Sequence, residues 1–433
     1  MSSSTEIILI FGIFIALLCS GLWVPFAITV ASLLYVATHG GFGSLKAMGL
    51  VSWGSMDSFT LTAIPLFIML ALIMEKSGLS FSVYRALSLF VKRIPGGLLQ
   101  TNVAGCALFA AISGSSVATA AAIGSVALPQ LLQRGYDRKL SAGTLAAGGT
   151  LGIMIPPSLA FIIYGTFTET SIAKLFMAGV IPGLVLTGLF MLYVAIHAII
   201  KPEIAPRETA AITRQEWTRA LFDLMPFVLL IGGTMGSIYM GLVTPTEAAG
   251  VGCLFAIIIA RIWGNLDWQS FRGAMFETVL VSGNILFIVY SAFLFSYAIS
   301  MAGVGRDLTN FLGGLNLSRL EFLACLFILY TILGCLIESI GMIVITVPLL
   351  YPVLLKYGID PVWFGVILVL FIEMGQITPP VGINLFVIQS IWKGKLSEVV
   401  YGTIPFHLIM FLVVGLLVIW PEIAVWLPRA MSR

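Results

Sequence analysis

The feature that most restricts how this chain can fold is a succession of long apolar stretches joined by short polar segments. Each stretch is long enough, or nearly so, to cross the hydrocarbon core of a bilayer as a helix. The stretches are Glu6–Ser20, Leu22–Thr38, Phe59–Lys76, Leu98–Gln133, Leu140–Thr166, Ile172–Ile200, Leu221–Met240, Thr246–Trp263, Thr278–Met301, Leu320–Leu355, Pro361–Trp392 and Tyr401–Leu427. Only 9% of the residues are charged, against roughly a quarter in a soluble domain. We therefore expect an all-α polytopic membrane protein embedded in a lipid bilayer.

The charge balance and the cysteines exclude other classes of protein. The formal net charge is only +3 and the basic residues are scattered, so we expect no nucleic-acid partner. All five cysteines lie in apolar stretches without a CxxC spacing. We interpret them as small buried hydrophobic residues and not as a metal or disulfide framework.

An internal repeat divides the chain into two halves. Ser116 in the first half matches Ser339 in the second, 223 positions further on, and six other pairs share this offset without a gap. The other pairs are Pro129 and Pro352, Gly135 and Gly358, Asp137 and Asp360, Gly152 and Gly375, Pro156 and Pro379, and Pro157 and Pro380. Matches among glycine, proline and aspartate are far less expected by chance than matches among apolar residues, so we interpret the halves as repeats.

The repeat predicts the organisation of the chain. Residues 1–200 form the first repeat, with a re-entrant hairpin at about 98–133 and a broken helix at about 140–166. A cytoplasmic connector follows at 201–220. Residues 221–433 form the second repeat, with a hairpin at about 320–356 and a broken helix at about 361–392. If each hairpin returns to the side from which it entered, five crossings remain per repeat, and the two repeats have inverted topologies.

The basic residues predict the orientation. When the open end of the first hairpin is placed in the cytoplasm, most of the 22 Lys and Arg residues fall on the cytoplasmic side. This agrees with the positive-inside rule. Both termini are then expected to lie in the periplasm.

Two kinds of interruption in the apolar stretches supply oxygen atoms. The segment Ser113–Ser116 is small and hydroxylated, and Pro156 and Pro157 free carbonyl groups in the preceding turn by removing two amide donors. Hydroxyl and carbonyl oxygens suit a small hard cation such as Na⁺, which transporters hold at unwound helix segments. The second repeat offers the same arrangement at Glu338–Gly341 and Gly375–Thr378. The alternative is that Gly and Ser only permit close helix packing.

Three acidic residues lie in apolar surroundings. Glu338 and Glu373 break the repeat symmetry, since Ser115 and Thr150 occupy the matching positions. Each is a candidate for cation or proton binding, unless it faces a water-filled vestibule or pairs with a basic residue. Glu247 follows Thr244 at the spacing of a helix cap, and we interpret it as at least equally structural.

Five motifs in chain order carry a family resemblance. They are ISGSSVATAAAIGSVALP, GTLGIMIPPS, GLVTPTEAAG, ESIGMIVITVP and GQITPPVGINLF. These motifs resemble the large membrane subunit of tripartite ATP-independent periplasmic (TRAP) transporters over essentially the whole chain. The resemblance implies an ion-transporter-superfamily fold with a scaffold and a mobile transport domain that moves as an elevator. It also implies sodium-coupled uptake of a carboxylate such as a C4-dicarboxylate or sialic acid across the bacterial inner membrane.

The resemblance also implies partners and site residues. The partners are a small four-helix membrane subunit and a periplasmic substrate-binding protein. The first cation site would use Ser113, Ser115, Gly152, Ile155 and Pro157. The second would use Glu338, Gly341, Gly375 and Thr378. The substrate would lie near Ser116, Thr119, Ser158 and Asn384.

Other functions remain to be separated from this one. A stand-alone anion/sodium symporter or a cation/proton antiporter of the same superfamily would share these features. The chain contains no GxxxxGK[ST] phosphate loop, so uphill transport would draw on an ion gradient. An intramembrane enzyme is disfavoured because no serine–lysine, paired-aspartate or HExxH arrangement occurs.

Overall fold

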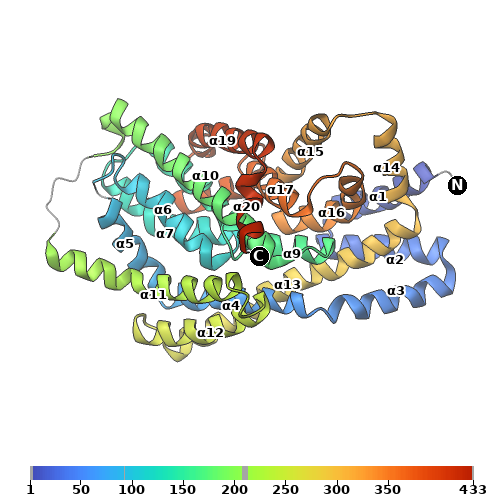
Figure 1. Ribbon diagram of the computed structural model, residues 1–433, viewed down its shortest axis with the longest axis horizontal. Coiled ribbons are helices and arrows are strands. Elements are labelled where there is room, and N and C mark those ends of the chain that lie inside the picture. Colours follow the sequence, from blue (N-terminus) through green and yellow to red (C-terminus); the bar gives the residue numbers. More distant parts are fainter. Residues whose placement is uncertain (1–2, 92, 207–212, 432–433) are drawn as a thin grey trace.

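A computed structural model describes residues 3–91, 93–206 and 213–431, and these parts of the chain are helical with no strand. Residues 207–212 of the expected connector lie outside the described residues. Among the described residues, nine helical segments are long and apolar enough to cross a membrane. The elements, most of them labelled in Figure 1, are α1 (Ser3–Cys19), α2 (Val24–His39), α3 (Gly41–Met56), η1 (Phe59–Thr62), α4 (Ala63–Lys76), α5 (Leu79–Val91), α6 (Leu98–Ser113), α7 (Ser116–Gln133), α8 (Arg138–Met154), α9 (Leu159–Thr168), α10 (Ile172–Ile200), η2 (Pro202–Ile204), α11 (Arg214–Tyr239), α12 (Pro245–Ile262), α13 (Trp268–Met301), α14 (Val304–Gly314), α15 (Arg319–Gly334), α16 (Ser339–Lys356), α17 (Pro361–Gln376), α18 (Ile383–Trp392), α19 (Leu396–Ile419) and α20 (Glu422–Met431).

Matching positions of the two halves begin matching helices. Asp137 precedes α8 and accepts a hydrogen bond from the Leu140 amide at 2.7 Å. Asp360 precedes α17 and accepts from the amides of Val362 and Trp363 at 2.8 and 3.0 Å. Each carboxylate satisfies amides that have no partner within their own helix. The pairs α6–α7 and α15–α16 occupy the ranges expected for the hairpins, and α8–α9 and α17–α18 those expected for the broken helices.

The helices form two groups that meet along α13. In the first group, which we call the outer layer, α12 and α13 pack against α4, and α2 and α3 pack against α13. Figure 1 shows this layer along the lower part of the molecule, together with α11. The second group, the hairpin layer, comprises α6–α10 and α15–α19, and its centre is α8, which contacts α6, α7, α18 and α19. The hairpin layer touches the outer layer through α13 on α16 and α4 on α6.

Paired glycines bring backbones together within the hairpin layer. A Cβ atom on Gly143 of α8 would overlap the backbone of Gly402 on α19, and a Cβ on Gly402 would overlap the Lys139 carbonyl oxygen of α8. At a second crossing, a Cβ on Gly375 would lie 2.8 Å from the Cα of Gly334 and from the Tyr330 carbonyl oxygen. Small residues allow this approach, and membrane helices associate largely through such van der Waals packing.

Several elements differ from the expected stretches. The sequence did not predict α3, because glycines, serines and a lysine interrupt its apolar residues. Helix α13 begins ten residues before the stretch that starts at Thr278. The stretch Tyr401–Leu427 is divided at Trp420 and Pro421 into α19 and the amphipathic α20. The interpretation of all five cysteines as buried was wrong for Cys19 and Cys325, which are exposed.

Candidate functional site

The first tip lies between α6 and α7 and contacts the break between α8 and α9. Gly114 ends α6 with a φ of +61°, which a residue with a side chain rarely adopts, and Ser115 caps α7. A Cβ on Gly114 would lie 2.9 Å from the Pro157 carbonyl oxygen. The amide of Leu159 donates to the Gly114 carbonyl at 3.2 Å. The tip and the break therefore form one unit.

Four of the five residues predicted for the first cation site meet in this unit. Ser113 Oγ lies 2.6 Å from Thr119 Oγ1, and the Gly152 Cα packs against Thr119 and the Ser115 carbonyl oxygen. Ile155 ends α8, and its side chain lies against Gly183 of α10. The structure thus brings Ser113, Ser115, Gly152 and Pro157 together and directs the Ile155 side chain elsewhere.

The four residues predicted to bind substrate are all buried. Asn384 of α18 donates to Ser116 Oγ at 2.5 Å, so an interaction crosses from one repeat to the other. Thr119 bonds Ser113 as described, and Ser158 caps α9 while donating to the Ile153 carbonyl at 2.6 Å. These side chains support the first tip, and their role in binding substrate stays a prediction.

The residues predicted for the second cation site are more dispersed. Glu338 precedes α16 without capping it, and Gly341 lies in the first turn of that helix. Gly375 packs against α15. Thr378 Oγ1 donates to the Met374 carbonyl at 2.6 Å and lies 2.9 Å from His407 Nε2. Cys335, which lies between α15 and the second tip, donates from Sγ to the Pro379 carbonyl at 3.2 Å. This hydrogen bond links the second tip to the break between α17 and α18.

A cavity of about 540 Å³ joins the two tips. Ser113, Gly114 and Ser115 line it from the first tip, and the segment 338–340 lines it from the second. The opposite wall comes from α4 and α13 of the outer layer. This volume falls within the usual range for small-molecule sites, which is roughly 300–1,000 Å³.

Sequence reasoning missed the polar residues of that opposite wall. Glu75 on α4, and Glu277 and Asn284 on α13, all line the cavity. Glu277 pairs with Lys76 at 2.8 Å. Glu277 lies before the predicted stretch at Thr278, and Glu75 is next to a basic residue at a helix end, where acids are common. The missed signal in both cases was a carboxylate at the edge of a spanning stretch.

The remaining acids have different environments. Glu247 forms a capping box with Thr244, accepting from its amide at 2.8 Å, which confirms the structural interpretation. Glu373 is fully buried, and neither carboxylate oxygen has a hydrogen-bond partner among the described residues.

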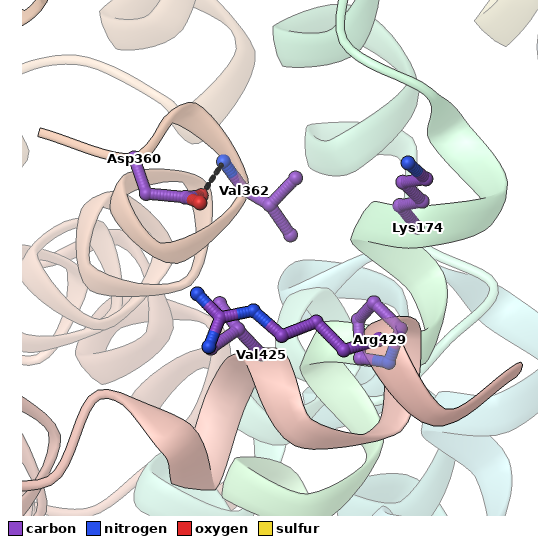
Figure 2. A pocket seen from close by; sticks show the side chains of 6 residues that line it. Lys174, Asp360, Val362, Val425 and Arg429 are labelled. Atoms are coloured by element: carbon purple, nitrogen blue, oxygen red, sulfur yellow. Dashed lines mark hydrogen bonds between the residues drawn. The ribbon is translucent and has the colours of Figure 1, made fainter. Parts of the chain in front are cut away.

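A second, open cavity of about 310 Å³ lies away from the tips (Figure 2). Figure 2 shows Lys174, Asp360 and Arg429 around it, with the Asp360 carboxylate turned towards the Val362 amide of its own helix. Arg429 pairs with Glu422. The charged groups of Asp360 and Arg429 are thus already engaged within the protein.

Comparison with known proteins identifies the family. The model of the tripartite ATP-independent periplasmic transporter DctM component matches residues 11–423. The chain is 33% identical to the C4-dicarboxylate TRAP transporter large permease protein DctM of Rhodobacter capsulatus, over 98% of this chain and 99% of that one. It is also 33% identical to the ectoine/5-hydroxyectoine TRAP transporter large permease protein UehC of Ruegeria pomeroyi, over 85% of this chain and 86% of that one.

Two further matches differ in length or in identity. The chain is 34% identical to the isethionate TRAP transporter permease protein DctMQ of Oleidesulfovibrio alaskensis over 93% of its residues, but spans only 63% of that protein. The crystal structure of the YdaH transporter of Alcanivorax borkumensis superposes with a TM-score of 0.66, covering 90% of each chain at 16% identity. That likeness supports the all-α polytopic membrane fold. With the family model matching nearly its whole length, this chain belongs to the DctM family of TRAP transporter large permeases and is a membrane transport subunit, not an enzyme.

Proposed function

We propose that this protein is the transport subunit for sodium-coupled uptake of an organic acid across the bacterial inner membrane. The observation that carries the proposal is the single cavity bounded by both tips and by the outer layer. Its lining residues come from both repeats, as expected for a transporter whose site lies where two inverted repeats meet.

The chemistry of the first tip fits a sodium ion. Pro156 has no N–H group, so the Gly152 carbonyl lacks the donor that a continuous helix would supply four residues later. The Gly152 Cα packs against the Ser115 carbonyl oxygen and the Thr119 hydroxyl, and the Thr119 hydroxyl is hydrogen-bonded to the Ser113 hydroxyl. These are neutral, hard oxygen donors. When bound, the ion would supply a positive charge close to the cavity, and Ser113, Ser115, Gly152 and Pro157 would hold it together with the backbone carbonyl of Ile155.

The second tip offers a different set of donors. Glu338 lines the cavity and contributes a carboxylate, whereas the Gly375 carbonyl already accepts a hydrogen bond from the Thr378 amide at 3.1 Å. A second sodium ion would therefore rely more on Glu338 and less on freed carbonyls than the first. We keep Glu338, Gly341, Gly375 and Thr378 as the proposed second site, held together through Cys335.

The two layers fit an elevator movement. The hairpin layer contains both tips and is tied together by the glycine contacts of α8 with α19 and of α15 with α17. The outer layer would act as the scaffold against which the hairpin layer moves. The cavity lies at the boundary between the layers, so such a movement would carry bound solute along α4 and α13.

We include the partners and the orientation in the proposal. A periplasmic substrate-binding protein would deliver the solute, and a small four-helix membrane subunit would complete the complex. Both termini would lie in the periplasm and the connector in the cytoplasm, which follows from the distribution of basic residues.

Uptake by reconstituted vesicles tests this function. Vesicles that contain the membrane subunits and an inward sodium gradient should accumulate organic acid only when the binding protein is present outside. Replacing the sodium gradient with a potassium gradient of equal size should abolish accumulation. Uptake by this chain alone would favour a stand-alone symporter, and exchange of sodium for protons without accumulation of organic acid would favour a cation/proton antiporter.

A further inference from the structure

The charges that line the cavity between the tips are all negative. Glu75, Glu277 and Glu338 contribute carboxylates, and within the described part of the chain no lysine or arginine is among the lining residues. Lys76 stands behind this wall and pairs with Glu277. Glu277 is therefore balanced within the protein, Glu338 belongs to the proposed second sodium site, and Glu75 is left to be balanced by the solute.

These acids occupy defined walls of the cavity. Glu75 lies in the last turn of α4 and Glu277 on α13, both in the outer layer, whereas Glu338 belongs to the second tip. Asn284 follows Glu277 by seven residues and therefore lies on the same face of α13. Its Oδ1 is buried and has no hydrogen-bond partner among the residues described. The outer-layer wall thus presents a row of oxygen acceptors.

The first tip, on the opposite wall, has the reverse polarity, whereas the second tip carries the Glu338 carboxylate. Helices α7 and α16 begin at the two tips, each 18 residues long, and their first residues border the cavity. The N-terminus of a helix carries a partial positive charge and unpaired amide groups, which attract carboxylates. Ser113, Ser115 and Ser339 add hydroxyl groups that can donate to the same anion.

The geometry points to a solute that carries both a carboxylate and a cationic group, such as a betaine, a basic amino acid or a cyclic amidinium acid. Its carboxylate would lie at the start of α7 in the first tip, and its cationic group would face Glu75 and Asn284. A dicarboxylate would place a second negative charge against this acidic wall, where like charges repel. The inference rests on the proposed transport function and narrows its substrate class.

Overall similarity does not already decide the substrate class. The chain is 33% identical both to a permease named for C4-dicarboxylate and to one named for ectoine, and 34% identical to one named for isethionate. The choice between a zwitterion and a purely anionic solute therefore depends on the residues that line the cavity.

Ligand-induced stabilisation of the purified membrane complex tests the inference without any sodium gradient. The probes are ectoine and glycine betaine, which carry both charges, and succinate and isethionate, which are purely anionic. In the presence of sodium chloride, the first pair should raise the unfolding temperature in a concentration-dependent manner and the second pair should not. Stabilisation by succinate or isethionate but by neither zwitterion would overturn the inference, and so would failure of both zwitterions to bind.

Substitution of Glu75 adds a second, independent measure. The Glu75→Gln variant should weaken zwitterion binding at least tenfold, while Glu203→Gln, which replaces an exposed acid within the connector, should bind like the original protein. Unchanged zwitterion affinity in Glu75→Gln contradicts the inference. If that variant does not fold, the unfolding temperatures of the unmodified complex with the four probes still test the inferred substrate class. Zwitterion binding with sodium-independent uptake would refute sodium coupling and leave the substrate class intact.

Discussion

At the scale of single residues, the first tip contains hydroxyl groups that hydrogen-bond to one another. Ser113 Oγ lies 2.6 Å from Thr119 Oγ1 and also lies within 3.4 Å of the Ser115 amide. A cation bound there would replace part of this network. The tip is therefore satisfied without an ion and remains able to exchange its internal hydrogen bonds for coordination, because hydroxyl groups rotate freely.

The hydroxyls of the first tip should set the sodium dependence of uptake. We expect Ser113→Ala or Ser115→Ala to raise the half-saturating sodium concentration about five- to tenfold, or roughly 1–1.4 kcal/mol of binding free energy. The control is Ser125→Ala, an exposed serine later in α7 that bonds only to its own helix at Ala122. Sodium activation that is the same in all three variants would exclude this site.

At the residue scale, the sequence motifs named residues that the structure brings together, such as Ser116 and Asn384, but did not name the acids of the outer-layer wall. Ser113 and Thr119 lie one hairpin turn apart, so the motif itself brings them together. Glu75 and Glu277 are about 200 positions apart, and only the packing of α4 on α13 places them on one wall. The repeat comparison did not single them out, because it relied on identities between the halves.

At the scale of elements, the closest helix contacts in the hairpin layer lie at glycines, and the internal repeat identified only some of these glycines. Gly152 and Gly375 belong to the repeat, whereas Gly143 and Gly402 do not. The sequence predicted the main helices from their apolar length. It missed α3 and the early start of α13, because polar residues interrupt the apolar run in both segments.

The contact of α8 with α19 should be sensitive to a single methyl group. We expect Gly143→Ala to lower stability, because overlap with the Gly402 backbone costs about 1–3 kcal/mol. Alanine otherwise favours a helix by about 1 kcal/mol over glycine. Gly188→Ala in α10, where a Cβ meets nothing within 4 Å, isolates that gain and should be neutral or stabilising.

Thermal unfolding of the two purified glycine variants in detergent compares these effects. The order of unfolding temperatures should be Gly188→Ala highest, then the original protein, then Gly143→Ala. Equal unfolding temperatures for the two variants would show that α8 and α19 can separate without loss of stability. The hairpin layer would then not behave as one body.

At the scale of the whole molecule, transport requires that the hairpin layer can move as a unit past the outer layer. Contacts within each layer should then persist through the cycle, and contacts between layers should break. Phe167 of α9 and Phe293 of α13 stack across the boundary with ring centroids 4.7 Å apart. Thr29 of α2 and Ser291 of α13 bond at 2.9 Å within the outer layer.

Cross-linking these two contacts distinguishes movement between the layers from a fixed structure. In a variant without the five native cysteines, paired cysteines at 167 and 293 should abolish uptake when a short bifunctional reagent joins them, and a reducing agent should restore it if the linker is cleavable. Paired cysteines at 29 and 291 should retain uptake after the same treatment, because both belong to the outer layer. Full uptake by the 167–293 cross-linked protein would mean that solute crosses the membrane while the layers stay in place. In that case the tips themselves would have to open and close, and the proposed elevator movement would be excluded.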